Sequence, residues 1–264
     1  MVEEYRTYEK TYLIIGASSD VGLAYIDSLA RRFREGDGVS VCILAHYHYH
    51  KEPLLELARK YPAIELKPIQ ADLSDEKQTV KLIEEVLSRV TYPNYILHFP
   101  AMPFHHMRIK ELDTDDLRLE MNVQVYSLLA LFRTFLPLMN KEAGNKVLVM
   151  LTSYVTEELP PKFMTDYIVT KYALMGAMKS AAAEYGGKNV KINGIAPIMM
   201  DTKFLANLDP KIKEITAMRS AIGRVPGPEE LIPYIDEMLD DAYTENGFVR
   251  LIDESCFGEK ERND

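Results

Sequence analysis

The sequence predicts an α/β fold, a doubly wound parallel sheet of about seven strands with helices on both faces. Two observations carry this prediction. Short β-rich apolar runs alternate with segments whose apolar residues recur at helical spacing, and a glycine-bearing turn joins the first run to the first helical segment. Because parallel strands need a crossover between them, usually a helix, this alternation indicates a parallel sheet.

The strands and helices can be placed in order along the chain. The apolar runs predict strands at 12–15, 39–44, 64–69, 95–98, 146–151, 191–195 and 248–252. Helical spacing follows the first strand at Ile26, Leu29, Ala30 and Phe33, and the third strand at Val80, Ile83, Val86 and Leu87. Longer helical stretches are expected at 114–139 and 167–184. We expect one domain over 1–264, with a frayed tail at 258–264.

Composition and charge argue against several classes of protein. Of the 264 residues, 47% are hydrophobic, enough for a full core, and the net charge of −9 comes without a basic block. We therefore expect no nucleic-acid partner and no membrane partner. The two cysteines suggest neither a disulfide framework nor a metal site. The polar start at 1–10 is unlike a signal peptide and no apolar stretch could span a bilayer, so a cytoplasmic protein is expected.

Tyr167 and Lys171 are four residues apart, a spacing that places both side chains on one face of a helix. A free tyrosine, with a pKa of about 10, is a weak base at neutral pH. An adjacent ammonium favours the phenolate, so we expect Lys171 to lower the pKa of Tyr167 and allow proton exchange near neutrality. Alone the pair is weak evidence, because a solvated helix face has the same pattern.

The first strand runs into the turn Gly16-Ala-Ser-Ser-Asp-Val-Gly22, which opens the first helix. Glycines permit a tight turn and close approach of a ligand, and the helix N-terminus offers free N–H groups to a pyrophosphate. The alternative is an ordinary strand-to-helix turn with serine and aspartate caps.

Further residues appear in an order that, as a set, resembles the short-chain dehydrogenase/reductase family over nearly the whole chain. The matching residues and segments are Gly16, Asp20, Gly22, Asp72, Asn122, Ser153, Tyr167, Lys171, 193–197, Thr202, 223–225 and 228–230. The resemblance implies a Rossmann-type fold and hydride transfer between a nicotinamide and a carbonyl or alcohol carbon.

The chain also departs from the family pattern. Asp20 replaces a glycine of the turn, and His98-Phe-Pro-Ala101 replaces the usual Asn-Asn-Ala-Gly. The spacing from Ser153 to Tyr167 is one residue longer than is common in the family. These differences indicate a divergent member.

The resemblance implies four catalytic roles. Tyr167 would exchange a proton with the substrate oxygen, and Lys171 would hold the nicotinamide ribose. Ser153 would hydrogen-bond the substrate oxygen, and Asn122 would hold a water that links Lys171 to solvent. Taken singly, such residues also fit purely structural roles: Ser153 could end a strand, Asn122 could hydrogen-bond at a helix kink, and Asp72 could cap the following helix.

The resemblance also implies the cofactor contacts, which are Gly16, Ser18, Ser19, Asp20, Val21, Gly22, His46, Asp72, Leu73, Pro100, Ala101, Tyr167, Lys171, Pro197 and Thr202. Ala45 stands where NAD enzymes have an acid, and His46 where NADP enzymes often have arginine, which favours NADP over the alternative, NAD. Alternate histidines at 46, 48 and 50 could hold a metal, but a loop over the adenosine fits them better. We expect no metal.

The segment 199–218 is expected to form a substrate lid, because it combines methionine, phenylalanine and leucine with charged residues. A ketone or alcohol on an apolar body is the expected substrate, and the resemblance most favours a 3-oxoacyl-reductase-like enzyme. Family members are commonly tetramers, so a homo-oligomer, either a dimer or a tetramer, is expected. The competing hypothesis is a non-catalytic nucleotide-binding sensor or scaffold of the same fold.

Overall fold

The computed structural model of the protein describes residues 8–33, 39–103, 106–187 and 189–258, so nearly all of the tail expected to fray lies outside the described residues. Seven strands form one sheet in the order β3-β2-β1-β4-β5-β6-β7, and every neighbouring pair is parallel. The strands are β1 (Lys10–Ile15), β2 (Val41–Tyr47), β3 (Glu65–Gln70), β4 (Tyr95–His98), β5 (Asn145–Met150), β6 (Val190–Pro197) and β7 (Val249–Ile252).

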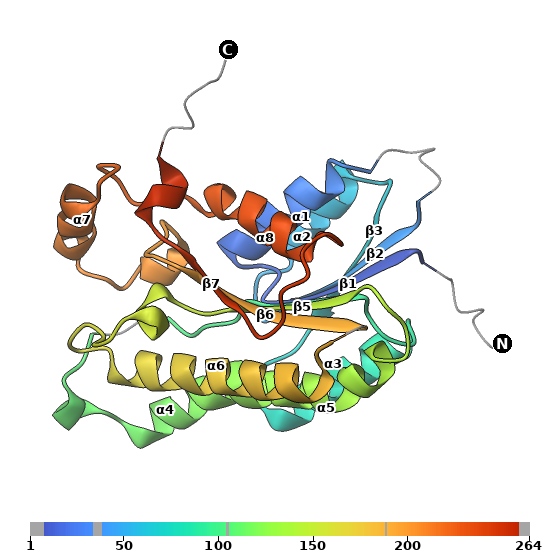
Figure 1. Ribbon diagram of the computed structural model, residues 1–264, viewed down its shortest axis with the longest axis horizontal. Coiled ribbons are helices and arrows are strands. Elements are labelled where there is room, and N and C mark those ends of the chain that lie inside the picture. Colours follow the sequence, from blue (N-terminus) through green and yellow to red (C-terminus); the bar gives the residue numbers. More distant parts are fainter. Residues whose placement is uncertain (1–7, 34–38, 104–105, 188, 259–264) are drawn as a thin grey trace, which may run out of the picture.

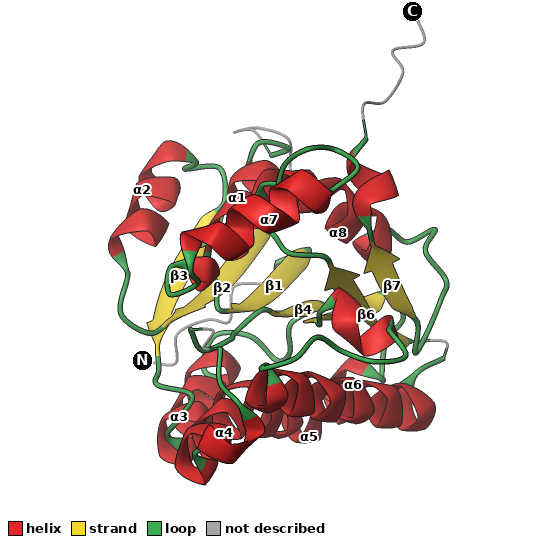
Figure 2. Cartoon of the chain, turned by 90° about the vertical axis from the view of Figure 1, so that its left-hand side faces the viewer, coloured by secondary structure: helices red, strands yellow, loops and turns green. Residues whose placement is uncertain are grey.

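Helices cover both faces of the sheet (Figures 1 and 2). They are α1 (Asp20–Ala30), α2 (Glu52–Lys60), α3 (Glu76–Leu87), α4 (Thr114–Met121), α5 (Ser127–Met139), α6 (Thr165–Tyr185), α7 (Pro210–Arg219) and α8 (Ile232–Leu239). α1, α2 and α8 lie on one face, and α3, α4, α5 and α6 on the other. Buried apolar residues form one large cluster on each side. The Rossmann-type α/β fold expected from the sequence is confirmed.

Continuous burial explains why the central strands have unbroken apolar sequences. Every residue of β2 and of β4 is buried, because helices cover both faces of the sheet. β2 continues through His46 to Tyr47, three residues beyond the predicted end of that strand at 44.

The long helix expected at 114–139 is interrupted. α4 ends at Met121, the segment Asn122–Tyr126 is a π-helix, and α5 begins at Ser127. Single π-helical turns of this kind are frequent at functional sites. No helix among the described residues is long and apolar enough to cross a membrane.

The order of the strands determines where a ligand can bind. From β1 the chain runs outward to β2 and β3, and then returns to β4 on the other side of β1. Loops that leave the carboxyl ends of β1 and β4 therefore diverge, and open a crevice where parallel α/β sheets bind their ligands.

Candidate active site

A cavity of about 1060 Å³ opens at this crevice. Its walls come from the loops after β1, β2, β3, β4 and β5, from α6, and from the segment after β6. Of the residues expected at the site, the cavity is lined by Gly16, Ser18, Ser19, Asp20, Val21, His46, Asp72, Leu73, Pro100, Ala101, Tyr167, Lys171, Pro197 and Thr202. The expected residues outside its lining are Gly22, Asn122 and Ser153.

The turn after β1 requires both of its glycines. Gly16 has a φ of +77°, and a Cβ on it would lie 3.1 Å from the backbone nitrogen of Pro100. A Cβ on Gly22 would lie 2.6 Å from the carbonyl oxygen of Ala17. Ser19 caps α1, because its hydroxyl accepts a hydrogen bond from the Gly22 N–H at 3.1 Å. The turn thus brings bare backbone and the N-terminus of α1 to the cavity, as a pyrophosphate requires.

The buried side chain of His46 supports this turn by hydrogen bonding to its backbone. Its Nδ1 accepts a hydrogen bond from the Gly16 N–H at 3.0 Å, and its Nε2 lies 3.0 Å from the Ala71 carbonyl, to which it donates. The side chain is 3% exposed, and burial lowers its pKa to about 4. His46 is therefore neutral with both ring nitrogens occupied, so the expectation that it replaces a phosphate-binding arginine is wrong.

The three residues that follow the end of β2 at Tyr47, which are His48, Tyr49 and His50, also line the cavity. The Nε2 atom of His48 lies 3.6 Å from Oδ2 of Asp72, and its ring stacks on Tyr49 with centroids 3.6 Å apart. The sequence predicts a polar loop over the adenosine for these histidines, because they follow the end of a strand.

Tyr167 and Lys171 occupy successive turns of α6 and reach the cavity together. Nζ of Lys171 lies 5.7 Å from the centre of the Tyr167 ring and donates a hydrogen bond to the Met150 carbonyl at 3.1 Å. Burial raises the pKa of Tyr167 above its ordinary value, and it lowers the pKa of Lys171 to about 8. The expected lowering of the Tyr167 pKa is therefore wrong for this state, because desolvation disfavours the phenolate and outweighs the lowering by a hydrogen bond with Thr152.

The hydroxyl beside Tyr167 belongs to Thr152. A hydrogen bond between Thr152 and Tyr167 partly offsets the rise in the tyrosine pKa, and Thr152 lines the cavity. Ser153 begins a 3-10 turn and lines a separate hollow of about 160 Å³. The expectation that Ser153 faces Tyr167 is therefore wrong, because the turn directs the second of the two adjacent hydroxyl side chains away from the cavity.

Asn122 lies behind the cavity. Its side-chain amide donates to the Ser74 carbonyl at 3.0 Å, and its own carbonyl accepts from the Ser127 N–H across the π-helical turn. Asn122 therefore joins this helical segment to the loop after β3. In that loop the Ser74 N–H and hydroxyl donate to Asp72 at 2.9 and 2.7 Å.

The segment after β6 closes over the other end of the cavity. Oδ2 of Asp20 accepts a hydrogen bond from the backbone N–H of Lys203 at 2.6 Å. The ring of Phe204 lies 5.7 Å from that of Tyr167, and Leu208 packs in the same apolar cluster as Met164. This segment therefore contacts both the glycine turn and the region of Tyr167.

A family model described as enoyl-(acyl carrier protein) reductase matches residues 16–244. The chain belongs to the short-chain dehydrogenase/reductase family. This short-chain dehydrogenase/reductase is 25% identical over 228 residues to the 3-oxoacyl-(acyl-carrier-protein) reductase of Thermotoga maritima, covering 86% of this chain and 88% of the relative. It is also 25% identical over 241 residues to meso-2,3-butanediol dehydrogenase of Serratia marcescens, covering 90% of each.

Among solved structures, the L-sorbose reductase of Gluconobacter frateurii, complexed with NADPH and L-sorbose, has a TM-score of 0.79 to this short-chain dehydrogenase/reductase. The two share 20% identity, with 97% of this chain and 99% of that chain covered, so the likeness concerns the fold. The family match and the named relatives make the protein an NAD(P)-dependent oxidoreductase.

Proposed function

We propose that the protein reduces a carbonyl carbon on an apolar substrate with NADP(H), as a 3-oxoacyl-reductase-like enzyme. The observation that carries this proposal is the convergence of Thr152, Tyr167 and Lys171 in one cavity with the glycine turn after β1. A bound nicotinamide would supply the hydride. The bare backbone of Gly16 and the N-terminus of α1 fit its pyrophosphate.

The protein's own residues then control the proton. Since burial raises the pKa of Tyr167, its phenol holds its proton at neutral pH and acts as a donor to the carbonyl oxygen. The Thr152 hydroxyl steadies the negative charge that develops on that oxygen. Both properties suit reduction better than oxidation.

The choice of NADP over NAD rests on two supports. No acid stands at the end of β2, where Ala45 is followed by His46, and that end lies against the cavity. Two similar solved structures, one of them the L-sorbose reductase, are described as complexes with NADPH. The alternative, NAD, is distinguished by titrating the protein with NADPH and NADH and following the fluorescence of the reduced nicotinamide itself, because the chain has no tryptophan to serve as an energy donor.

The substrate end of the cavity is apolar, with Met102, Leu119, Val123, Met164, Phe204 and Leu208 in its lining. We assign residues 199–218 as the substrate lid, because Phe204 and Leu208 contribute to this lining while the contact with Asp20 fastens the segment to the turn after β1. An acyl, alicyclic or aliphatic ketone suits this lining, since apolar groups gain most from leaving water there.

The test is a panel of 3-oxoacyl thioesters, diketones and alicyclic ketones, with NADPH consumption followed by absorbance. Tyr167→Phe should abolish turnover while keeping cofactor affinity, and Tyr154→Phe, which alters a second cavity tyrosine, should not. Equal turnover by Tyr167→Phe and the wild type would overturn the mechanism. Tight NADPH binding without turnover of any ketone would favour the sensor or scaffold.

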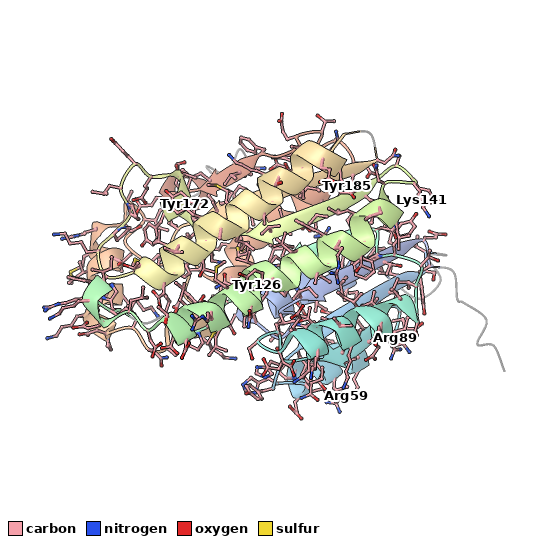
Figure 3. The ribbon with its side chains drawn as sticks, turned by 90° about the horizontal axis from the view of Figure 1, so that it is seen from below. Arg59, Arg89, Tyr126, Lys141, Tyr172 and Tyr185 are labelled. Atoms are coloured by element: carbon pink, nitrogen blue, oxygen red, sulfur yellow. The ribbon has the colours of Figure 1, made fainter. Side chains whose placement is uncertain are left out.

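A homo-oligomer, a dimer or a tetramer, completes the proposal. Apolar side chains are exposed along the outer face of α6 and the neighbouring helical segment, including Tyr126 at 55%, Leu129 at 43% and Val169 at 45%. Figure 3 shows Tyr126 and Tyr172 on this face. Light scattering should give a multimer for the wild type and a smaller species for Tyr126→Ser combined with Leu129→Ser. A cytoplasmic location stays a prediction.

A further inference from the structure

A buried carboxyl group stands on the helix that packs against α6, the helix of Tyr167 and Lys171. Glu120, in the last turn of α4, is only 6% exposed. α4 packs against α6, below the sheet in Figure 2. The Glu120 carboxyl accepts a hydrogen bond from the side-chain amide of Gln124, which is fully buried in the π-helical turn. Acids are seldom buried to this degree unless they are paired or have a function.

The charged groups that act on Glu120 come from α6. Burial raises the pKa of Glu120 to about 7, Lys171 lowers it, and Asp166 raises it. In turn, Glu120 is the carboxylate that raises the pKa of Lys171, whose burial brings it down to about 8. Glu120 also acts on Tyr167, where its charge opposes the phenolate. Burial therefore moves the pKa of the acid up and that of the ammonium down, which brings the proton affinities of these two interacting groups closer together.

Three buried polar atoms, in the π-helical turn, α6 and β4, also need a further hydrogen-bond partner. Oε1 of Gln124, Oγ1 of Thr170 and Nδ1 of His98 are buried without a hydrogen-bond partner among the described residues. Thr170 precedes Lys171 on α6, and the charge of Lys171 acts on the His98 ring. Buried polar groups of this kind are ordinarily satisfied by internal water. Together they make the region behind the cavity polar, in contrast to its apolar substrate end.

Resting on the proposed function, we propose that Glu120 is the internal proton donor that restores Lys171, and through it Tyr167, after each reduction. The O–H bond of Tyr167 breaks as the alcohol O–H bond forms, which leaves a phenolate. An N–H bond of the Lys171 ammonium then breaks to restore the phenol. The O–H bond of the Glu120 acid breaks to restore the ammonium, and the resulting carboxylate takes a proton from water. One proton is consumed for each hydride transferred.

The kinetic test compares Glu120→Gln, which keeps the shape and the hydrogen-bonding capacity, with the wild type on an accepted ketone. As the pH rises through about 7, the wild-type kcat should fall, because Glu120 loses its proton. In Glu120→Gln the kcat should be about tenfold lower with KM unchanged, less than the loss of about 10²-fold or more for a group that transfers its proton directly to substrate. Its pH profile should lack the step near 7.

Two controls separate this role from a structural one. Glu120→Asp should retain the step in the pH profile, and Asp116→Asn, which removes an exposed acid from the same helix, should leave kcat and its profile unchanged. Thermal unfolding verifies that Glu120→Gln is folded. A folded Glu120→Gln enzyme with the wild-type kcat and profile would overturn the inference alone, whereas a wild type that turns over no ketone would overturn the proposed function and this inference with it.

An infrared titration of the protein without ligand gives a readout that needs no turnover. The wild type should show a buried carboxylic acid carbonyl band that disappears as the pH rises through about 7. The band should be absent from Glu120→Gln and present in Asp116→Asn. If the band persists in Glu120→Gln, or if no such band exists in the wild type, Glu120 does not hold a proton near neutrality and the inference is overturned.

Discussion

The carboxylate of Asp20 holds the backbone N–H of Lys203 at 2.6 Å, which joins the turn after β1 to a segment 183 residues further along the chain. The ammonium of Lys203 lies 3.4 Å from the other carboxylate oxygen, but its side chain is 86% exposed. The backbone hydrogen bond is therefore the stronger part of this contact. The aspartate that departs from the family's glycine thus fastens the 199–218 segment over the cavity.

Removing this contact should loosen the segment. Asp20→Ala removes a hydrogen bond of about 1 kcal/mol, so we expect trypsin to cleave near Lys203 roughly fivefold faster and the KM for the carbonyl substrate to rise by a similar factor. The control is Asp201→Ala, which breaks the exposed pair with Lys213 within the same segment and should change little. Equal cleavage of the two variants would contradict the role given to Asp20.

The two adjacent hydroxyl residues after β5 should differ sharply in their effect on turnover. Thr152→Val keeps the shape but removes the hydroxyl beside Tyr167, and should lower kcat by about 10²- to 10³-fold, as loss of an oxyanion donor does. Ser153→Ala should retain nearly full kcat, because Ser153 lines another hollow. Steady-state kinetics decides, and a larger loss in Ser153→Ala would reverse the assignment.

Crowding at Gly22 makes it sensitive to a single methyl group. In Gly22→Ala the new Cβ would lie 2.6 Å from the Ala17 carbonyl, so the turn must shift and cofactor affinity should fall at least tenfold. Gly176→Ala is the matched control, since no atom of the described residues outside its own helix backbone and its chain neighbours lies within 4 Å of its Cβ position in α6. That change should stabilise the helix by about 0.5–1 kcal/mol. NADPH titration and thermal unfolding measure both effects.

Stability should decrease on mild acidification because two histidines are buried in neutral form. The pKa of His46 is lowered to about 4 and that of His98 to about 3, in both cases by burial, from an ordinary 6.5. Between pH 6.5 and about 4 the two rings bind protons in the unfolded chain but not in the folded protein, so their contribution to the free energy of unfolding is complete above pH 6.5 and falls as the pH drops. Each histidine contributes a slope that approaches about 1.4 kcal/mol per pH unit, and Glu120, whose pKa is raised to about 7, opposes it with a slope of the other sign.

Urea unfolding at a series of pH values checks this slope. In the Glu120→Gln background, which removes the opposing carboxyl, His98→Asn should reduce the slope by about half. A free energy of unfolding of Glu120→Gln that stays flat from pH 6.5 to 4.5 would show that the buried rings do not resist protonation.

The sheet was predictable because its strands are buried on both faces and so appear as short, unbroken apolar runs. The glycine turn was predictable because it combines a strand end, two glycines and a helix start. The end of β2 was not, since His46 looks polar in the sequence but is buried with both ring nitrogens on backbone groups. A periodicity argument cannot distinguish such a histidine from the start of a loop.

The sequence predicted that Tyr167 and Lys171 act together, but it did not predict the directions of their pKa shifts. Spacing places Tyr167 and Lys171 on one helix face, whereas their pKa values depend on the desolvation that tertiary packing imposes. The position of Thr152 depends on a 3-10 turn, for which the sequence gives only the lengthened spacing to Tyr167. The burial of Glu120 was not predictable, because an acid in a helix ordinarily faces water.

His46 has a practical consequence for altering the dinucleotide preference of this enzyme. Replacing the strand-end residue with arginine or an acid, the usual first attempt in protein engineering, would here remove the clamp between Gly16 and Ala71. Such a variant would disrupt the glycine turn that binds the dinucleotide, so its affinity for both NADP and NAD would fall and its preference between them could not be altered usefully. Libraries should instead vary positions 48 to 50, where the side chains face the cavity and none is needed to support the turn.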